Sequence, residues 1–114
     1  MAARSLPRSV SEALERFANA VRERFGARAT ELVLFGSRAR GDAHEESDVD
    51  VLVVIEGLSD AERLLVLDLA GIQDYASERW VGLAPLVYSS AEASRMRAGG
   101  RRLFRDIDRE GAAL

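Results

Sequence analysis

Two polar motifs at the borders of two apolar runs constrain this chain more than any other feature. Gly36 and Ser37 close the first run, and Asp48 and Asp50 open the second, with ten residues between Ser37 and Asp48. Short apolar runs of this kind are typical of buried strands. If both motifs serve one site, the end of the first strand must lie beside the start of the second, which makes the two strands antiparallel. The pattern therefore predicts an antiparallel strand pair with a polar site at one end.

The residue types in these motifs favour a site for a phosphate-bearing ligand and a divalent cation. Gly36 has no Cβ, so the backbone can come close to a ligand there. Ser37 offers a hydroxyl and a backbone N–H where a short helix is expected to begin, which is an anion-binding geometry. Asp48 and Asp50 are two residues apart on a strand, so their side chains share one face. Two carboxylates on one face repel each other unless a cation lies between them, and Mg²⁺ usually takes one or two carboxylates together with substrate phosphates.

The Gly-Ser pair, the ten-residue spacer and the Asp-x-Asp pair together resemble the signature of the DNA polymerase β-like nucleotidyltransferase superfamily. The similarity is greatest to the minimal nucleotidyltransferases, which are small proteins of about this length. It covers residues 30–55 closely and the rest of the chain in element order. It implies an α/β (α+β) fold with a small mixed sheet of about three strands and helices packed largely on one side.

The resemblance also implies roles for the motif residues. Asp48 and Asp50 match the catalytic pair that binds divalent ions, Mg²⁺ or Mn²⁺, and Gly36 and Ser37 match the segment that holds the nucleoside triphosphate. In this family two ions help a hydroxyl attack the α-phosphate, and pyrophosphate leaves. The alternative interpretation of the two acids is that they are polar residues at the entrance of a strand.

Two arginines next to the Gly-Ser pair are candidate phosphate ligands. The guanidinium groups of Arg38 and Arg40 could pair with phosphate oxygens through parallel N–H donors. For Arg40, an exposed loop charge without a binding role is the alternative. Ser37 is expected both to cap the short helix and to bind the ligand, with capping alone as the other interpretation.

The family usually supplies a third metal-binding carboxylate from the next strand, and this sequence departs from that pattern. The next strand is expected at residues 81–88, and no acid occurs between Glu78 and Glu92. Ala84 or Pro85 stands roughly where the acid is expected. Loss of one of three carboxylates should weaken the binding of the ion that activates the attacking hydroxyl. It should have less effect on the ion that is carried by the triphosphate. Nucleotide binding could therefore survive while chemistry slows.

Capping signals and apolar spacing predict the remaining elements. Ser-x-x-Glu sequences that begin at Ser9, Ser59 and Ser89 are typical of helix starts. Trp80, at the start of the third strand, is expected to cover an edge of the core, with a role at an interface as the alternative. The expected helices lie at residues 9–25, 59–79, 89–98 and 101–109, and the expected strands lie at residues 30–35, 48–55 and 81–88.

Composition limits the other functions that the chain can have. At 114 residues it is expected to form one domain, residues 1–114, with residues 1–8 as a flexible tail. Its net charge of −3 argues against a protein that binds long nucleic acids. The absence of cysteine excludes disulfides and thiolate metal sites. No apolar run approaches the ~20 residues of a membrane-spanning helix, so a cytoplasmic protein is the default expectation.

Two functions are consistent with these features. The first is a Mg²⁺-dependent nucleotidyltransferase that moves AMP from ATP to a hydroxyl on a partner protein, because many minimal nucleotidyltransferases accompany a small helical HEPN-domain protein and some modify it. The second is a catalytically weakened homologue that acts as an antitoxin-like binding module for such a partner. The intact first motif favours the enzyme, and the absent third acid favours the binding module. A homodimer is compatible with both, and the sequence does not identify the acceptor or the preferred base.

Overall fold

A four-stranded mixed sheet with the strand order β3-β2-β1-β4 forms the centre of the protein, and the structure, a computed structural model, describes residues 6–114. β1 and β2 run antiparallel, as the motif spacing predicts, β3 joins β2 in parallel, and β4 joins β1 antiparallel. The expected fold class is confirmed, with four strands instead of about three because two residues near the C-terminus form an edge strand. The strands are β1 (Ala29–Phe35), β2 (Val49–Ile55), β3 (Leu83–Ser89) and β4 (Ala112–Ala113).

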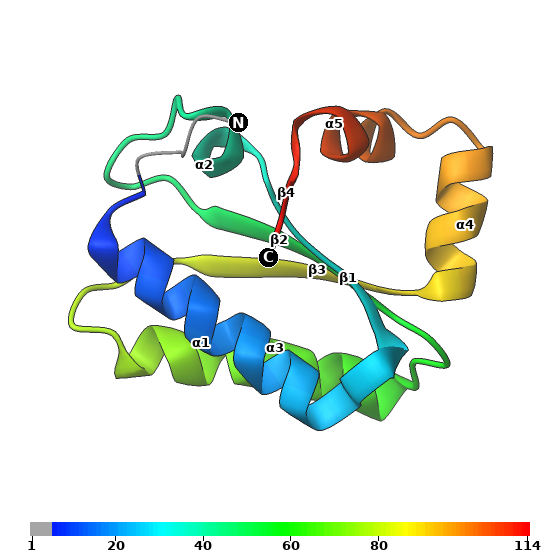
Figure 1. The fold of residues 1–114 in the computed structure, drawn as a ribbon, viewed down its shortest axis with the longest axis horizontal. Helices are drawn as coiled ribbons and strands as arrows, with labels where there is room; N and C mark the ends of the chain where they lie inside the picture. The colour runs from blue at the N-terminus through cyan, green and yellow to red at the C-terminus, as the bar shows by residue number, and fades with distance from the viewer. Residues whose placement is uncertain (1–5) are drawn as a thin grey trace.

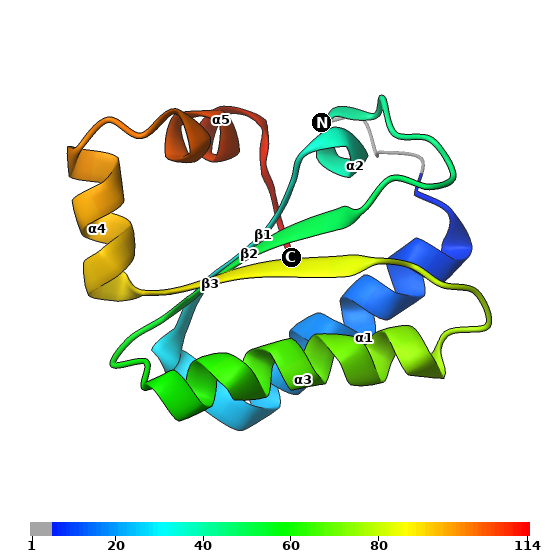
Figure 2. The same ribbon diagram turned by 180° about the vertical axis from the view of Figure 1, so that it is seen from behind.

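Helices lie on both faces of the sheet, and the two longest share one face (Figure 1). α1 and α3 pack there against the odd-numbered side chains of β2, and the shorter α4 and α5 pack against Leu52 and Val54 on the opposite face (Figure 2). Among residues 6–114, no helix has both the length and the apolar character to cross a membrane. The helices are α1 (Arg8–Phe25), α2 (Ser37–Arg40), α3 (Asp60–Ala76), α4 (Ser90–Ala98) and α5 (Arg102–Glu110), with a 3₁₀ turn at Gly26–Arg28.

The first helix begins without the capping box that the sequence suggests. α1 starts at Arg8, its N-cap residue is Pro7 and no side chain caps it, so Ser9 lies inside the first turn and the expected cap is wrong. Because the residue before a proline is disfavoured in the helical conformation, Pro7 sets the start of the helix instead. Of the tail expected at residues 1–8, Arg8 is therefore helical, and residues 1–5 lie outside the described part of the chain.

The other two capping boxes are confirmed. Ser59 and Ser89 each accept a hydrogen bond from the N–H of the glutamate three residues later, and each glutamate accepts one from the N–H of its serine. α3 ends at Ala76, three residues before its expected end, and a loop then leads to β3. In Figure 1 this loop and the segment that follows α2 lie at the same end of the sheet, where β2 begins.

Candidate functional site

The chain turns sharply at Gly36, between the end of β1 and the start of α2. Gly36 has a φ of +75°, a backbone conformation that favours glycine. Its carbonyl oxygen accepts hydrogen bonds from the N–H groups of Ala39 and Arg40, which form the single turn of α2. A side chain at residue 36 would collide with the carboxylate of Asp50. Both the backbone and the space taken by Asp50 therefore require glycine here.

The two carboxylates of the second motif lie at the start of β2, beside this turn. Phe35 pairs with Asp50 in the β1–β2 ladder, which brings Gly36 next to Asp50. Asp48 is exposed and Asp50 is half-buried. Burial raises the pKa of Asp50, the nearby charge of Asp48 raises it further, and Arg40 partly offsets the rise. The repulsion between the two acids and the bare backbone beside them fit a divalent cation that joins the acids to a phosphate.

The start of β3 forms another side of the site. The N–H of Val49 donates to the carbonyl oxygen of Gly82 at 2.8 Å. A Cβ at Gly82, where φ is +77°, would lie 3.3 Å from Oδ1 of Asp48 and 3.4 Å from Nε1 of Trp80. Trp80 is 81% exposed, so the expectation that it covers a core edge is wrong. Its indole nitrogen instead borders the same small space beside Gly82 as the Asp48 carboxylate.

A buried aspartate that the motif analysis missed holds this loop in place. The carboxylate of Asp74, in the last turn of α3, accepts hydrogen bonds from the N–H groups of Val81, Gly82 and Leu83. The three N···O distances are 3.2, 2.9 and 2.9 Å. Asp74 occupies the last buried position of α3, where helical spacing predicts an apolar residue, and this is the sequence signal that could have revealed it.

The register of β3 decides which residue stands in place of the absent third acid. Asp50 pairs with Ala84, and Val51 pairs with Pro85, in the parallel ladder. Since paired residues of neighbouring strands point to the same face, Ala84 shares the face of Asp50 and Pro85 points to the opposite one. Within residues 6–114, no group of three or more His, Cys, Asp or Glu side chains could hold a metal ion. Among the described residues, the candidate ligands for a cation are therefore the carboxylates of Asp48 and Asp50.

Ser37 does not cap α2, and the side chain of Arg38 beside it is buried. Gly36 is the N-cap of α2, Ser37 is the first helical residue and no side chain caps the helix, so the expected capping role of Ser37 is wrong. Arg38 is only 7% exposed, and its Nη2 donates weakly to the carbonyl oxygen of Ser47 at 3.5 Å. Its Nε has no hydrogen-bond partner among the described residues. Arg38 therefore supports the loop before β2 from inside instead of presenting a guanidinium to solvent.

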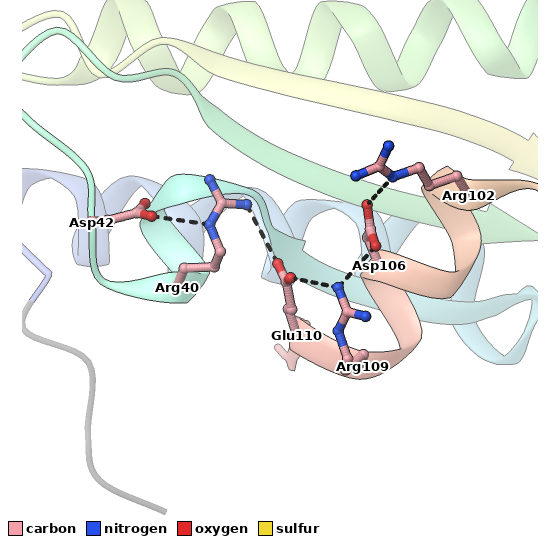
Figure 3. Close-up of polar contacts among 6 residues, drawn as sticks. All are labelled: Arg40, Asp42, Arg102, Asp106, Arg109 and Glu110. Carbon is pink, nitrogen blue, oxygen red and sulfur yellow. Dashed lines mark hydrogen bonds and ion pairs between the residues drawn. The ribbon is translucent and has the colours of Figure 1, made fainter.

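Arg40 is the exposed arginine of α2, and it bridges two acids (Figure 3). Its Nε lies 3.1 Å from Asp42, and its Nη1 lies 3.4 Å from Glu110 of α5. Its positive charge also partly offsets the rise in the pKa of Asp50. A phosphate bound near Asp50 would compete with Asp42 and Glu110 for this guanidinium. Figure 3 shows the ion pairs continuing along α5 from Glu110 through Arg109 and Asp106 to Arg102.

Comparison with known proteins identifies the family. Residues 14–95, more than half of the chain, match the family described as the nucleotidyltransferase domain. A Methanocaldococcus jannaschii protein, named as a candidate protein adenylyltransferase, is 46% identical over 43 residues, covering 38% of this chain and 43% of that protein. The protein adenylyltransferase MntA of Thermococcus cleftensis is 46% identical over 48 residues, covering 42% of this chain and 46% of MntA. The chain thus spans less than half the length of these two relatives.

A structural match extends over nearly the whole chain. The crystal structure of a candidate nucleotidyltransferase from Sulfolobus solfataricus has a TM-score of 0.49 at 21% identity, over 97% of this chain and 90% of that one. The family assignment rests on the match over residues 14–95, which contains both polar motifs. The resemblance seen in the sequence is therefore confirmed, and the chain belongs to the nucleotidyltransferase domain family.

Proposed function

We propose that this protein is a Mg²⁺-dependent nucleotidyltransferase that moves AMP from ATP to a hydroxyl group of a partner protein. The observation that carries the proposal is the close approach of the Gly36 turn to the Asp50 carboxylate. A triphosphate bound at the backbone of this turn would lie next to both acids of the motif. Membership of the nucleotidyltransferase family supports the reaction class.

The proposed reaction is a displacement at the α-phosphorus of the nucleotide. The acceptor oxygen forms a bond to the α-phosphorus, the bond from this phosphorus to the oxygen that bridges to the β-phosphorus breaks, and pyrophosphate leaves with that oxygen. The proton of the hydroxyl passes to water or to a base. Mg²⁺ held by Asp48 and Asp50 would neutralise charge on the triphosphate and on the leaving pyrophosphate.

In the proposed reaction, some residues of the chain would bind the cation or the phosphates, and others would keep these binding residues in position. Asp48 and Asp50 would hold the cation, and the raised pKa of Asp50 supports this role, because a cation would stabilise its charged form. The backbone N–H groups and hydroxyl at Gly36 and Ser37 would hold phosphate oxygens. Arg40 would exchange an acid partner for a phosphate oxygen, and Arg38 would contribute by positioning the loop that ends at Asp48.

A protein is the proposed acceptor because of the relatives and the family resemblance. The M. jannaschii and T. cleftensis relatives carry names that describe protein adenylyltransferases. The first candidate partner is a small helical HEPN-domain protein, since the resembling minimal nucleotidyltransferases accompany such proteins. ATP is the proposed nucleotide on the same grounds.

A binding module is the second candidate function, and one observation favours it. Ala84 faces the same side as Asp50 and stands where a third carboxylate could reach the metal site. A site with two carboxylates can still hold a triphosphate through a shared cation, yet it activates the attacking hydroxyl less well. Such a protein would restrain a HEPN-domain partner by contact, as an antitoxin-like module, with or without bound nucleotide.

Calorimetry with ATP tests the site without knowledge of the acceptor. We expect binding in Mg²⁺, loss of most of that binding in EDTA, and at least about tenfold weaker binding in Asp48→Asn and in Asp50→Asn. Glu15→Gln, which removes one exposed charge from α1, is the control and should bind as the wild type does. Equal affinity in EDTA would contradict a cation-bridged site.

Transfer of label from α-labelled ATP separates the two functions. The protein is incubated with Mg²⁺ or Mn²⁺ and the product of its neighbouring gene. Label on that product, lost in Asp48→Asn, supports the enzyme. Binding of ATP without transfer, in the presence of a partner that forms a stable complex, supports the binding module.

A further inference from the structure

The outer face of α3 carries large apolar side chains where a surface helix normally carries polar ones. Tyr75 is 93% exposed, Leu64 is 62% exposed and Ile72 is 57% exposed, and Leu67 is also largely accessible. By contrast, every exposed residue of the neighbouring helix α1 is polar or charged. Exposed apolar side chains that gather on one helix in this way mark a binding surface.

These residues form a continuous stripe. Positions 64, 67, 68, 71, 72 and 75 recur at intervals of three and four residues, so they lie along one side of the helix, and we call these six positions the α3 stripe. The opposite side of α3, with Val66 and Ala70, packs on the core. The stripe therefore faces away from the sheet.

The positions of the stripe are spaced symmetrically about a point between residues 69 and 70, so the same spacing is found toward either end of the helix. In an antiparallel pair of helices related by a two-fold axis, residue i of one copy contacts residue j of the other, and j contacts i. A pair of α3 helices centred on this point would match the large apolar residues with one another and place the one acid of the stripe opposite its glycine. The corresponding positions are Leu64 with Tyr75, Leu67 with Ile72, and Asp68 with Gly71.

The small and charged residues of this surface support the same register. A Cβ at Gly71 would meet no described atom within 4 Å, so a second helix can come close there. Asp68 would lie opposite Gly71 and not opposite another acid. Asp60 and Arg79, both exposed, also correspond about the same point. Each end of the contact would then bring an acid of one copy near an arginine of the other, which is charge complementarity between copies.

The available area is close to what a specific contact needs. A buried aromatic side chain removes ~150–250 Å² from water, and Trp80 continues the apolar surface beyond the end of α3. The apolar side chains together offer on the order of 600 Å² per copy, against ~800 Å² per partner in a standard interface. We propose that the α3 stripe is an interface between two copies of this chain, with the two α3 helices packed antiparallel about a two-fold axis.

The interface would also lie beside the candidate site. Trp80 follows α3 directly and borders, with Asp48, the space next to Gly82. A second copy seated on the stripe would have its residues 59–60 near the loop at residues 77–82. The interface does not depend on the proposed reaction and can be tested without nucleotide.

Sedimentation velocity over a range of concentrations tests the association. We expect a reversible dimer in the wild type, and at least about tenfold weaker association in Tyr75→Arg and in Leu64→Arg, because each places a charge opposite an apolar side chain of the other copy. Leu103→Arg is the matched control, since Leu103 is an exposed leucine on α5 outside the stripe. Circular dichroism establishes that each variant folds. A wild type that stays monomeric at ~1 mM, or equal weakening by Leu103→Arg, would overturn the proposal.

Cross-linking tests the register, and the chain contains no cysteine to interfere. Leu67→Cys and Ile72→Cys proteins, mixed in equal amounts with a short bis-maleimide, should give several-fold more cross-linked dimer than either protein alone. Leu64→Cys mixed with Ile72→Cys is the control for a shifted register and should give less. Equal yields from all mixtures would overturn the two-fold arrangement. Protection of these cysteines by a different protein and not by a second copy would overturn it as well.

Discussion

Gly36 lies against the carboxylate of Asp50, so that even one methyl group at residue 36 would overlap it. The β1–β2 ladder creates this contact, because Phe35 pairs with Asp50 and the chain turns directly afterwards. The proposed phosphate-binding turn and the proposed metal ligands are therefore parts of one paired unit of the sheet. A substitution in the Gly36 turn should therefore also affect the Asp50 carboxylate, and a substitution of Asp50 should also affect the turn.

Gly36→Ala should abolish ATP binding, because its methyl group must displace the Asp50 carboxylate. Gly41→Ala is the matched control, since Gly41 also has a positive φ, of +88°, but a Cβ there would meet nothing within 4 Å. Gly41→Ala should lose about 1–2 kcal/mol of folding free energy from its left-handed backbone. Gly36→Ala should lose more, because its ψ of −158° places it in a region that essentially only glycine adopts. Urea denaturation measures both losses. Calorimetry should show lost binding in Gly36→Ala alone. Similar losses in both would show that backbone strain, and not the contact with Asp50, controls binding.

Ala84→Asp should raise nucleotidyl transfer at least about tenfold if the protein is a weakened enzyme, because residue 84 shares the face of Asp50. Pro85→Asp is the control, since residue 85 points to the opposite face, and it should not raise transfer. The ladder from β2 to β3 is continuous through Pro85, so no bulge turns residue 84 away. The measurement is label transfer from α-labelled ATP to the partner protein. A vigorous wild type that Ala84→Asp slows would mean that the site does not lack a third carboxylate.

Asp50→Asn should make the fold more stable at pH 7 when divalent ions are removed. Burial and then Asp48 raise the pKa of Asp50 above its ordinary 3.8, so the charged carboxylate is less favourable in the folded than in the unfolded state. Its effect on stability is therefore absent at low pH and becomes unfavourable as the pH rises through the raised pKa. Urea denaturation in EDTA should show the higher midpoint in the variant, and Mg²⁺ should raise the midpoint of the wild type alone. A variant that is less stable in EDTA would contradict this account.

Asp74→Ala should cost about 2–4 kcal/mol of folding free energy, because it leaves three N–H groups at the start of β3 without their acceptor. Asp74→Asn retains one acceptor oxygen and should lose less. Hydrogen exchange at Val81, Gly82 and Leu83 should become faster in both variants, since the loop is no longer tied to α3. A loss below about 1 kcal/mol in Asp74→Ala would show that water can replace the carboxylate.

Glu62→Gln should remove part of the acid sensitivity of the fold. The ion-paired hydrogen bond from Arg28, with the N–H of Ser59, lowers the pKa of Glu62 from an ordinary 4.5 to about 2. A lowered pKa in the folded state stabilises the protein above pH 4.5, and this contribution is lost as the pH falls toward about 2. Urea midpoints should therefore fall more steeply with acid in the wild type than in the variant. Glu56→Gln, at an exposed acid after β2, should follow the wild type.

Local chemistry in the sequence determined most of the elements and the pairing of the first two strands. The capping boxes at Ser59 and Ser89 involve groups only three residues apart, so they form wherever a helix starts. The antiparallel β1–β2 pair follows from the two motifs, because a shared site requires the end of the first apolar run to lie beside the start of the second. The capping role assigned to Ser9 failed because Pro7, two residues earlier, had already set the start of the helix. These features depend on near neighbours in the chain, which a single sequence displays.

Only the tertiary structure decided which residues of distant segments meet. The choice between Ala84 and Pro85 follows from the β2–β3 register, and a shift of one residue would reverse it. Asp74 acquires its role because the end of α3 lies against the N–H groups that begin β3. Arg38 is buried and Arg40 reaches Glu110 because α2 packs against β1 and β2, close to the end of α5. Register and packing between segments arise from many weak contacts summed over the whole fold, whereas apolar spacing shows only which face of an element is buried.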